Sequence, residues 1–275
     1  MKTTPRGYNL TIEVNDFNLS YDDLGEGNRP VIFLHGFPFD KTMWQHQLHY
    51  LKSFGRVIAC DIRGFGKSTD EETPLSIALF GKDLIEFMDK LKIDKATICG
   101  LSMGGYIALN AFERSPERFE GLVLCDTQCI EDNVEAKEKR YNAIEQITKN
   151  GANDFNEAFI KKVFHEDSLL RKKEVVEQLR SVVFSNSQHI MTDGLRALAE
   201  RLETCTNLPS ITVPTLIICG KEDQLTPLPQ SEFMNKNIKG SMLRVIEHAG
   251  HVSNLEQPDE FNGYLKAFLS RLGAN

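Results

Sequence analysis

The chain has 275 residues, of which 41% are hydrophobic, and its formal net charge is −7. This length suits one large α/β domain with an insertion. The negative charge and the lack of a long basic run argue against nucleic acid or an anionic membrane surface as a partner. No apolar run has the length of a membrane span and no apolar leader follows Met1, so the expected location is cytoplasmic.

The first half of the chain alternates predicted strands with predicted helices. Residues 8–14 and 17–24 alternate polar and apolar side chains around Asn15-Asp16, which predicts an antiparallel hairpin at a sheet edge. Continuous apolar runs, typical of strands buried on both faces, occupy 31–34, 57–60, 95–99 and 121–125. Helical periodicity predicts helices over 44–54, 75–91 and 106–114.

The pattern changes between residues 130 and 208. No buried-strand run occurs in this segment. Charged and apolar residues mix there at helical spacing, over 134–148, 154–164, 169–184 and 189–202. We therefore expect residues 130–208 to form an all-helical insertion.

Buried-strand runs return after the insertion. They occupy 213–219 and 242–246, and a last helix is predicted over 258–272. Strands that alternate with helices predict a parallel sheet with helices on both faces. The expected fold is therefore an α/β core domain formed by residues 1–129 and 209–275.

A serine flanked by glycines lies between the third buried-strand run and the helix that follows it. Gly100-x-Ser102-x-Gly104 in this position is typical of a nucleophile elbow, a sharp strand-to-helix turn with serine at its apex. The apex residue has a strained, positive φ, and a Cβ on either glycine would crowd the neighbouring backbone. The following helix directs its unpaired N–H groups at the serine. We therefore predict that Ser102 is a nucleophile.

An aspartate and a histidine follow two later predicted strands. Asp223 lies in the loop after 213–219 and His251 in the loop after 242–246, and sites in parallel sheets lie beyond the carboxyl ends of the strands. A serine hydroxyl needs a base that takes its proton during attack, and imidazole suits neutral pH. The base needs a carboxylate that fixes its tautomer. Ser102, Asp223 and His251 are therefore predicted to form a catalytic triad.

Neighbouring residues are alternatives within this arrangement. Asp126 also follows a buried strand and could supply the carboxylate, but the intact Gly-x-x-Asp turn favours Asp223. His248 lies near His251 but belongs to the strand end, which favours His251 as the base. His35 is expected to hold its own loop through a backbone hydrogen bond.

With these motifs the chain resembles the α/β-hydrolase superfamily, in its branch of small esterases, enol-lactonases and cofactor-free perhydrolases. The resemblance covers nearly the whole chain and rests on His35-Gly36-Phe37, Asp61-x-Arg63-Gly64-x-Gly66-x-Ser68, Gly100-x-Ser102-x-Gly104-Gly105, Gly220-x-x-Asp223 and Gly250-His251. It implies a mostly parallel sheet and an oxyanion hole formed by the backbone N–H groups of Phe37 and Met103. It also implies that residues 130–208 form a helical cap over the pocket.

The resulting hypothesis is a serine hydrolase of carboxylic esters or lactones, in which Ser102 forms an acyl-enzyme and His251 later activates water. The resemblance implies no metal and no organic cofactor. The expected partner is a small-molecule acyl substrate, and the expected state is a monomer or a small homo-oligomer. A carbon–carbon bond hydrolase or a cofactor-free perhydrolase would carry the same triad, and a ligand-binding signalling protein can use the same scaffold.

The cysteines and the charged residues Asp61 and Arg63 are expected to stabilise the structure and to take no part in catalysis. No Cys-x-x-Cys occurs and four of the six cysteines lie near the ends of apolar runs. All six are therefore expected to be reduced and packed as small hydrophobic side chains. Asp61 and Arg63, in the loop after the second buried strand, are expected to form a structural ion pair or to lock their turn.

Overall fold

The computed structural model of the protein describes residues 6–70 and 73–273. Within these residues eight strands form one sheet: β1 Gly7–Val14, β2 Phe17–Leu24, β3 Val31–Leu34, β4 Val57–Cys60, β5 Ala96–Leu101, β6 Phe119–Cys125, β7 Thr215–Gly220 and β8 Met242–Ile246. The α-helices of the core are α1 Gln45–Leu51, α2 Ile77–Lys90, α3 Met103–Arg114, α9 Leu228–Asn237, α10 Ser253–Glu256 and α11 Pro258–Leu272. Residues 1–5 and 274–275, at the ends of the predicted core domain, lie outside the described residues.

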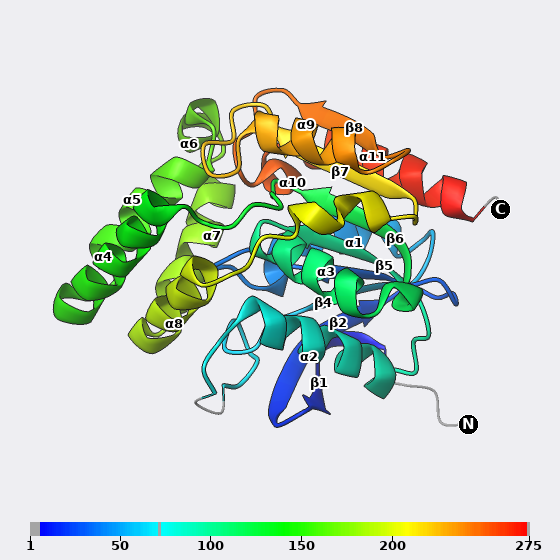
Figure 1. Ribbon diagram of the computed structural model, residues 1–275, viewed down its shortest axis with the longest axis horizontal. Coiled ribbons are helices and arrows are strands. Elements are labelled where there is room, and N and C mark those ends of the chain that lie inside the picture. Colours follow the sequence, from blue (N-terminus) through cyan, green and yellow to red (C-terminus); the bar gives the residue numbers. More distant parts are fainter. Residues whose placement is uncertain (1–5, 71–72, 274–275) are drawn as a thin grey trace.

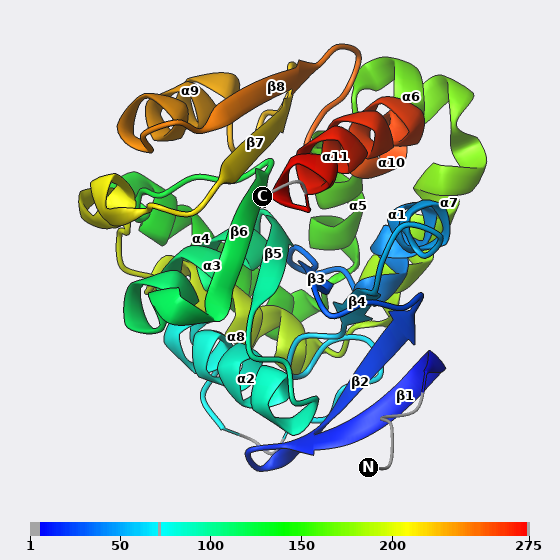
Figure 2. The same cartoon turned by 90° about the vertical axis from the view of Figure 1, so that its right-hand side faces the viewer.

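The sheet is mostly parallel, as the sequence predicts. Its strand order is β1-β2-β4-β3-β5-β6-β7-β8. The pairs β1–β2 and β2–β4 are antiparallel, and every other pair is parallel. The predicted hairpin is confirmed, and β1 forms the sheet edge (Figure 2). Strands β3, β4 and β5 are buried along their whole length because helices cover both faces of the sheet.

Successive side chains of the central strands enter two separate hydrophobic cores. Ile32 and Leu34 of β3 pack in the core that includes residues of α2 and α3. Val31 and Phe33 pack in the core that includes residues of α1 and α11. Figure 2 shows α2, α3 and α9 on one face of the sheet and α1 and α11 on the other. Each fully buried side chain of this kind contributes about 1.5–3 kcal/mol to folding.

The register of the parallel strands brings their carboxyl ends to one edge of the sheet. Leu101, the last residue of β5, pairs with Cys125 of β6, and Cys125 pairs with Ile218 of β7. Because these ends are level, the loops that follow β5, β6 and β7 start side by side. This edge is where the sequence places the candidate catalytic residues.

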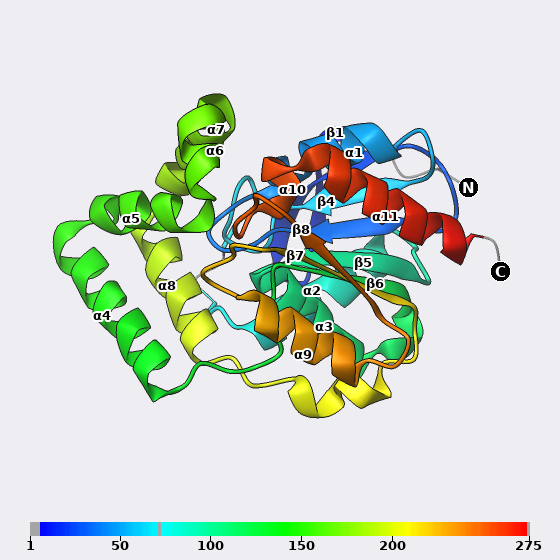
Figure 3. The same cartoon turned by 90° about the horizontal axis from the view of Figure 1, so that it is seen from above.

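The segment between β6 and β7 is helical. Residues 130–208, all of which the structure describes, contain no strand. Their helices are α4 Val134–Asn150, α5 Asn153–Val163, α6 Glu166–Arg171, α7 Lys173–Ser185 and α8 Gln188–Ala199. Figures 1 and 3 show α4–α8 gathered at one end of the molecule. The division of the chain into a core domain and a cap domain stays a prediction.

The expectation that all six cysteines are reduced is wrong for two of them. A disulfide joins Cys129, which follows β6, to Cys205, which begins a short 3-10 helix before β7. These residues are 76 positions apart, and they meet because the insertion leaves the core and returns to it at one place. The other four cysteines are free and buried, as expected.

The length and apolar character of the described helices show whether any of them could cross a membrane. Within residues 6–70 and 73–273, none combines the length and the apolar character that crossing a membrane requires. Disulfides are commonest in proteins of oxidising compartments. The expected cytoplasmic location stays a prediction, as does the expected monomer or small homo-oligomer.

Candidate active site

Ser102 lies at the tip of a sharp turn between β5 and α3. Its φ of 53° and ψ of −113° are strained for a residue with a side chain, as the sequence predicts. Hydrogen bonds hold the turn: Ser102 N–H donates to Cys125 O at 2.9 Å, and Ser102 O accepts from Gly105 N–H at 2.9 Å. Thr127 Oγ1 donates to the same oxygen at 2.8 Å. The strained turn is thus anchored to β6 and to the loop after it.

The glycines on either side of Ser102 leave no room for a side chain. A Cβ on Gly100 would lie 2.2 Å from Gly104 O, and a Cβ on Gly104 would lie 2.3 Å from Leu34 O. Both distances are far shorter than a van der Waals contact. The predicted reason for these two glycines, backbone crowding, is confirmed.

Asp223 and His251 are hydrogen-bonded to each other. Asp223 Oδ2 lies 2.8 Å from His251 Nδ1, and both side chains are buried. Asp223 Oδ1 accepts from the backbone N–H groups of Leu225 at 2.8 Å and Thr226 at 3.1 Å. Burial disfavours both charges, but mutual attraction outweighs it, so the pKa of Asp223 is lowered and the pKa of His251 is raised. The arrangement leaves Nε2 of His251 available to another partner.

Thr226, which the motifs do not single out, completes the hydrogen bonding of this pair. Its Oγ1 donates to Asp223 Oδ2 at 2.7 Å and lies 3.3 Å from His251 Nδ1. The sequence does contain a signal for it, since an aspartate commonly accepts from backbone N–H groups two or three residues later in a turn.

Asp126 lies beside the pair, but its hydrogen bonds lead elsewhere. Its Oδ1 accepts from Gly220 N–H at 2.7 Å and its Oδ2 accepts from the Ser253 hydroxyl at 2.5 Å. Burial, and then repulsion by Asp223, raises the pKa of Asp126 to about 8. The geometry therefore favours Asp223 over Asp126 as the carboxylate that orients His251.

Ser102 and His251 line one cavity of about 470 Å³. Residues of α4, α5 and α8 contribute to its walls, so the helical insertion closes part of it. The large apolar side chains of the lining are Phe37, Tyr106, Ile130, Phe155, Phe159, Leu195, Leu198 and Leu225, and the small ones are Ala136, Ala143 and Ala158. Lys139, Arg140 and Lys162 add positive charge, and Glu131 and Asp132 add negative charge. A cavity of this size and character suits a small organic ligand.

The loop after β3 passes directly beside Ser102. A Cβ on Gly36 would lie 3.3 Å from Ser102 Cβ. Phe37 follows Gly36 in this loop, and Met103 follows Ser102 as the first residue of α3, where a backbone N–H has no acceptor within the helix. One predicted oxyanion-hole residue therefore follows Gly36, which lies beside Ser102, and the other follows Ser102 itself.

His35 holds this loop, as predicted. Its Nδ1 lies 2.9 Å from Gly36 O, and its Nε2 accepts from Ile62 N–H at 2.9 Å. The ring has no exposed surface, and burial lowers the pKa of His35. A neutral ring with a proton on Nδ1 satisfies both hydrogen bonds.

The expected ion pair between Asp61 and Arg63 does not form. Asp61 pairs with the buried Lys41 at 2.9 Å, and Arg63 pairs with Asp83 at 2.8 Å. Asp61 still locks its turn, because its Oδ2 accepts from Lys67 N–H at 3.0 Å. Each partner comes from another part of the chain, so the sequence spacing of Asp61 and Arg63 is no guide to the pairing.

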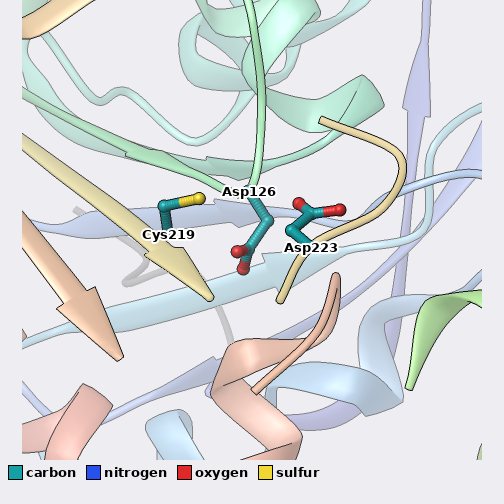
Figure 4. A group of neighbouring side chains, drawn as sticks. All are labelled: Asp126, Cys219 and Asp223. Carbon is teal, nitrogen blue, oxygen red and sulfur yellow. The ribbon is translucent and has the colours of Figure 1, made fainter. Parts of the chain in front are cut away.

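One group of described residues has the spacing of metal ligands. Figure 4 shows Asp126 between Cys219 and Asp223, and one ligand atom of each lies within 4.8 Å of the others. Protein donors already engage the oxygens of both aspartates. Burial raises the pKa of the Cys219 thiol well above its ordinary value, and a protonated thiol is not a metal ligand. The group gives no ground for assigning a metal, and the expected lack of a cofactor stays a prediction.

Comparison with known proteins identifies the family. The sequence profile described as alpha/beta hydrolase fold matches residues 29–258. The chain belongs to this family. The 3-oxoadipate enol-lactonase 2 of Acinetobacter baylyi is 30% identical over 262 residues, which cover 95% of this chain and 96% of that protein. The α/β-hydrolase fold expected from the sequence is confirmed, and the protein is an α/β-hydrolase enzyme.

Two solved α/β-hydrolase structures superpose closely on this one. A thermophilic esterase from Thermogutta terrifontis, with malate bound, has a TM-score of 0.91 and 32% identity, and the match covers 96% of this chain and 98% of that one. The enol-lactonase from Burkholderia xenovorans LB400 has a TM-score of 0.89 and 27% identity, with coverage of 95% and 100%.

Proposed function

We propose that the protein is a serine hydrolase that cleaves a carboxylic ester or a lactone through an acyl-enzyme on Ser102. The observation that carries the proposal is the 2.8 Å hydrogen bond between His251 Nδ1 and Asp223, made beside a cavity that both Ser102 and His251 line. The names of the similar proteins, an enol-lactonase and an esterase, support hydrolysis of this bond type.

Acylation follows from the roles of the three side chains. His251 Nε2 takes the proton of the Ser102 hydroxyl while Ser102 Oγ attacks the carbonyl carbon. Asp223 stabilises the imidazolium that forms and keeps the ring in the tautomer with a proton on Nδ1. His251 then gives its proton to the leaving alkoxide, which departs from an ester or stays attached to the acyl group from a lactone.

The backbone N–H groups of Phe37 and Met103 stabilise the tetrahedral intermediate. Negative charge develops on the former carbonyl oxygen, and two fixed N–H donors aimed at it lower the barrier. The buried hydrogen bonds of His35 support this role, since they hold the loop that carries Phe37.

Deacylation repeats the same steps with water. His251 takes a proton from water, hydroxide attacks the acyl carbon, and the proton returns to Ser102 Oγ as the acid leaves. Residues 130–208 act as the cap domain, since α4, α5 and α8 form part of the wall of the cavity that Ser102 and His251 line.

Hydrolysis of p-nitrophenyl esters and small lactones by the purified protein tests the proposal. Ser102→Ala should lower kcat by about 10⁶ and leave the circular dichroism spectrum unchanged. Ser185→Ala, which changes an exposed serine on α7, is the matched control and should have no effect. A Ser102→Ala variant that keeps more than about a tenth of the activity contradicts the nucleophile assignment. A single burst without steady-state turnover contradicts a hydrolase and favours a ligand-binding protein.

A further inference from the structure

A buried carboxylate on α10 connects the His251 loop to the helical insertion. Glu256 has no exposed surface. Its Oε1 accepts from Gly250 N–H at 2.6 Å, and its Oε2 accepts from His165 N–H at 2.7 Å. Gly250 directly precedes His251, whereas His165 lies between α5 and α6 of the insertion. One side chain therefore bridges the segment that carries the base and the segment that covers the cavity.

We propose that Glu256 is a positioning residue for the proposed general base, holding His251 in register with the α5–α6 junction of the insertion. The inference rests on the proposed function of His251. Glu256 does not touch the reacting atoms, and it acts through the backbone on either side of them. Figures 1 and 2 show α10 beside the end of the insertion that contains this junction.

The two segments that Glu256 joins are also in direct contact. His251 N–H donates to Val163 O, the last residue of α5, at 2.8 Å. A Cβ on Gly250 would lie 2.8 Å from Val163 O and 2.9 Å from His165 N. The backbones therefore meet as closely as glycine allows, and a shift of the α5–α6 junction must move the backbone of His251.

Further donors from the insertion fix Glu256 itself. Burial raises the pKa of Glu256, and the nearby Ser168 hydroxyl of α6 opposes this rise. Lys172, between α6 and α7, donates from Nζ to the backbone oxygen of Glu256. The carboxylate thus accepts from two backbone N–H groups, one on each oxygen, which suits a side chain with two acceptor oxygens and no donor.

The charge of Glu256 gives this role a measurable signature. Burial lowers the pKa of His251, and the carboxylates of Asp223, from the loop after β7, and Glu256, from α10, raise it. Asp126, from the loop after β6, also faces the ring, but its own pKa of about 8 leaves it mostly protonated at neutral pH. His251 must be neutral to accept a proton, so removal of the Glu256 charge moves the acid limb of the pH–rate profile to lower pH. A residue that only stabilises the fold does not move this limb.

The substitution Glu256→Gln distinguishes a residue that positions His251 from a residue that only stabilises the fold. Glutamine has one acceptor oxygen, and its NH₂ group would face Gly250 N–H or His165 N–H, so the His251 loop shifts against the insertion. We expect kcat to fall about a hundredfold with KM within about twofold of the wild type. The acid limb moves to lower pH. Glu256→Asp keeps the charge but is too short to bridge both donors, so kcat falls while the acid limb stays nearer that of the wild type.

The matched control is Glu222→Gln. Glu222 Oε2 accepts from Ala249 N–H at 3.3 Å in the same loop, but this hydrogen bond does not reach the insertion. The control should retain the wild-type kcat and acid limb. Equal effects of Glu256→Gln and Glu222→Gln overturn the proposal, and so does a fall in kcat for Glu256→Gln without a shift of the acid limb.

A second variant tests the role of Glu256 if the first variant does not fold. The activity of Ser102→Ala shows whether this inference or the proposed function has failed. If circular dichroism shows that Glu256→Gln does not fold, Ser168→Ala removes the α6 hydroxyl that lies near the carboxylate. It should lower kcat severalfold at constant KM, and an unchanged kcat overturns the proposal. Ester hydrolysis that Ser102→Ala does not reduce means that the proposed function has failed. Hydrolysis that depends on Ser102 but responds alike to the Glu256 and Glu222 variants means that only this inference has failed.

Discussion

The substitution Asp126→Asn tests the pair of buried carboxyl groups that Asp126 forms with Asp223. The side-chain oxygen of asparagine can accept from Gly220 N–H and its NH₂ group can donate to Ser253 Oγ, so both contacts of Asp126 are kept. The substitution replaces the titratable carboxyl group that faces Asp223 with a side chain that carries no charge at any pH. Because His251 is hydrogen-bonded to Asp223, Asp126→Asn should keep kcat within about tenfold of the wild type.

The pKa of Asp126 sets the expected gain in stability. Burial, and then repulsion by Asp223, raises this pKa from 3.8 to about 8. At neutral pH the folded protein therefore keeps a proton that the unfolded chain has released. Stability falls as the pH rises through this window, by about 1.4 kcal/mol per pH unit. Between about pH 4 and pH 7 the loss is about 4 kcal/mol, which Asp126→Asn does not suffer.

Urea unfolding of both proteins from about pH 5 to about pH 8 measures this difference. The free energy of unfolding of Asp126→Asn should exceed that of the wild type by a margin that grows by about 1.4 kcal/mol per pH unit and levels off near pH 8. A margin that does not change with pH refutes the reasoning, because Asp126 would then be ionised in the folded protein. A loss of activity as large as that of Asp223→Asn would show that Asp126 is the carboxylate of the triad.

Two other substitutions test the site. Asp223→Asn should lower kcat for p-nitrophenyl ester hydrolysis by about 10⁴, and should move the acid limb to lower pH because a charge that raises the pKa of His251 is lost. A loss below about tenfold counts against Asp223. Gly36→Val places a Cβ 3.3 Å from Ser102 Cβ and 3.1 Å from Leu101 Cδ2. It should displace one oxyanion donor and lower kcat about a hundredfold, with a melting temperature close to that of the wild type; a change confined to KM counts against the oxyanion assignment.

The sheet can be predicted from the sequence because its signals are local. Four-residue apolar runs such as Val31–Leu34 and Val57–Cys60 are buried along their whole length, so no side chain interrupts the pattern. The signal for the elbow at Ser102 is local too. Its glycines leave room for backbone that lies within a few residues along the chain or in the adjacent strand. These parts of the fold agree with the prediction.

Helix α9 has no such signal. Within Leu228–Asn237 only Ser231 and Met234 are buried, so the apolar stripe that identifies a surface helix is nearly missing. Over residues 169–184, in contrast, the sequence predicts one helix where the structure has parts of two. Helices α6 and α7 share an amphipathic pattern, but the backbone turns between them at Lys172, whose φ of −111° and ψ of 45° are not helical.

Pairings between distant segments cannot be read from spacing. The Cys129–Cys205 disulfide and the Lys41–Asp61 ion pair form because the fold brings their residues together. The hydrogen bonds of Glu256 could not be predicted either, since one donor is Gly250 N–H and the other, His165 N–H, belongs to the insertion. The hydrogen bond between Asp223 and His251 is the exception, because each residue follows a strand and the carboxyl ends of parallel strands share an edge. The triad with Ser102 stays a prediction.

A structure of the protein after reaction with an ester-like phosphonate tests the central claim most directly. The proposed function predicts a covalent bond between phosphorus and Ser102 Oγ, with the phosphonyl oxygen about 3 Å from the backbone nitrogens of both Phe37 and Met103. His251 Nε2 should face the bonded Oγ or the leaving-group position. An adduct on another residue, or on Ser102 with its oxygen held by a side chain or by only one of these nitrogens, would contradict it.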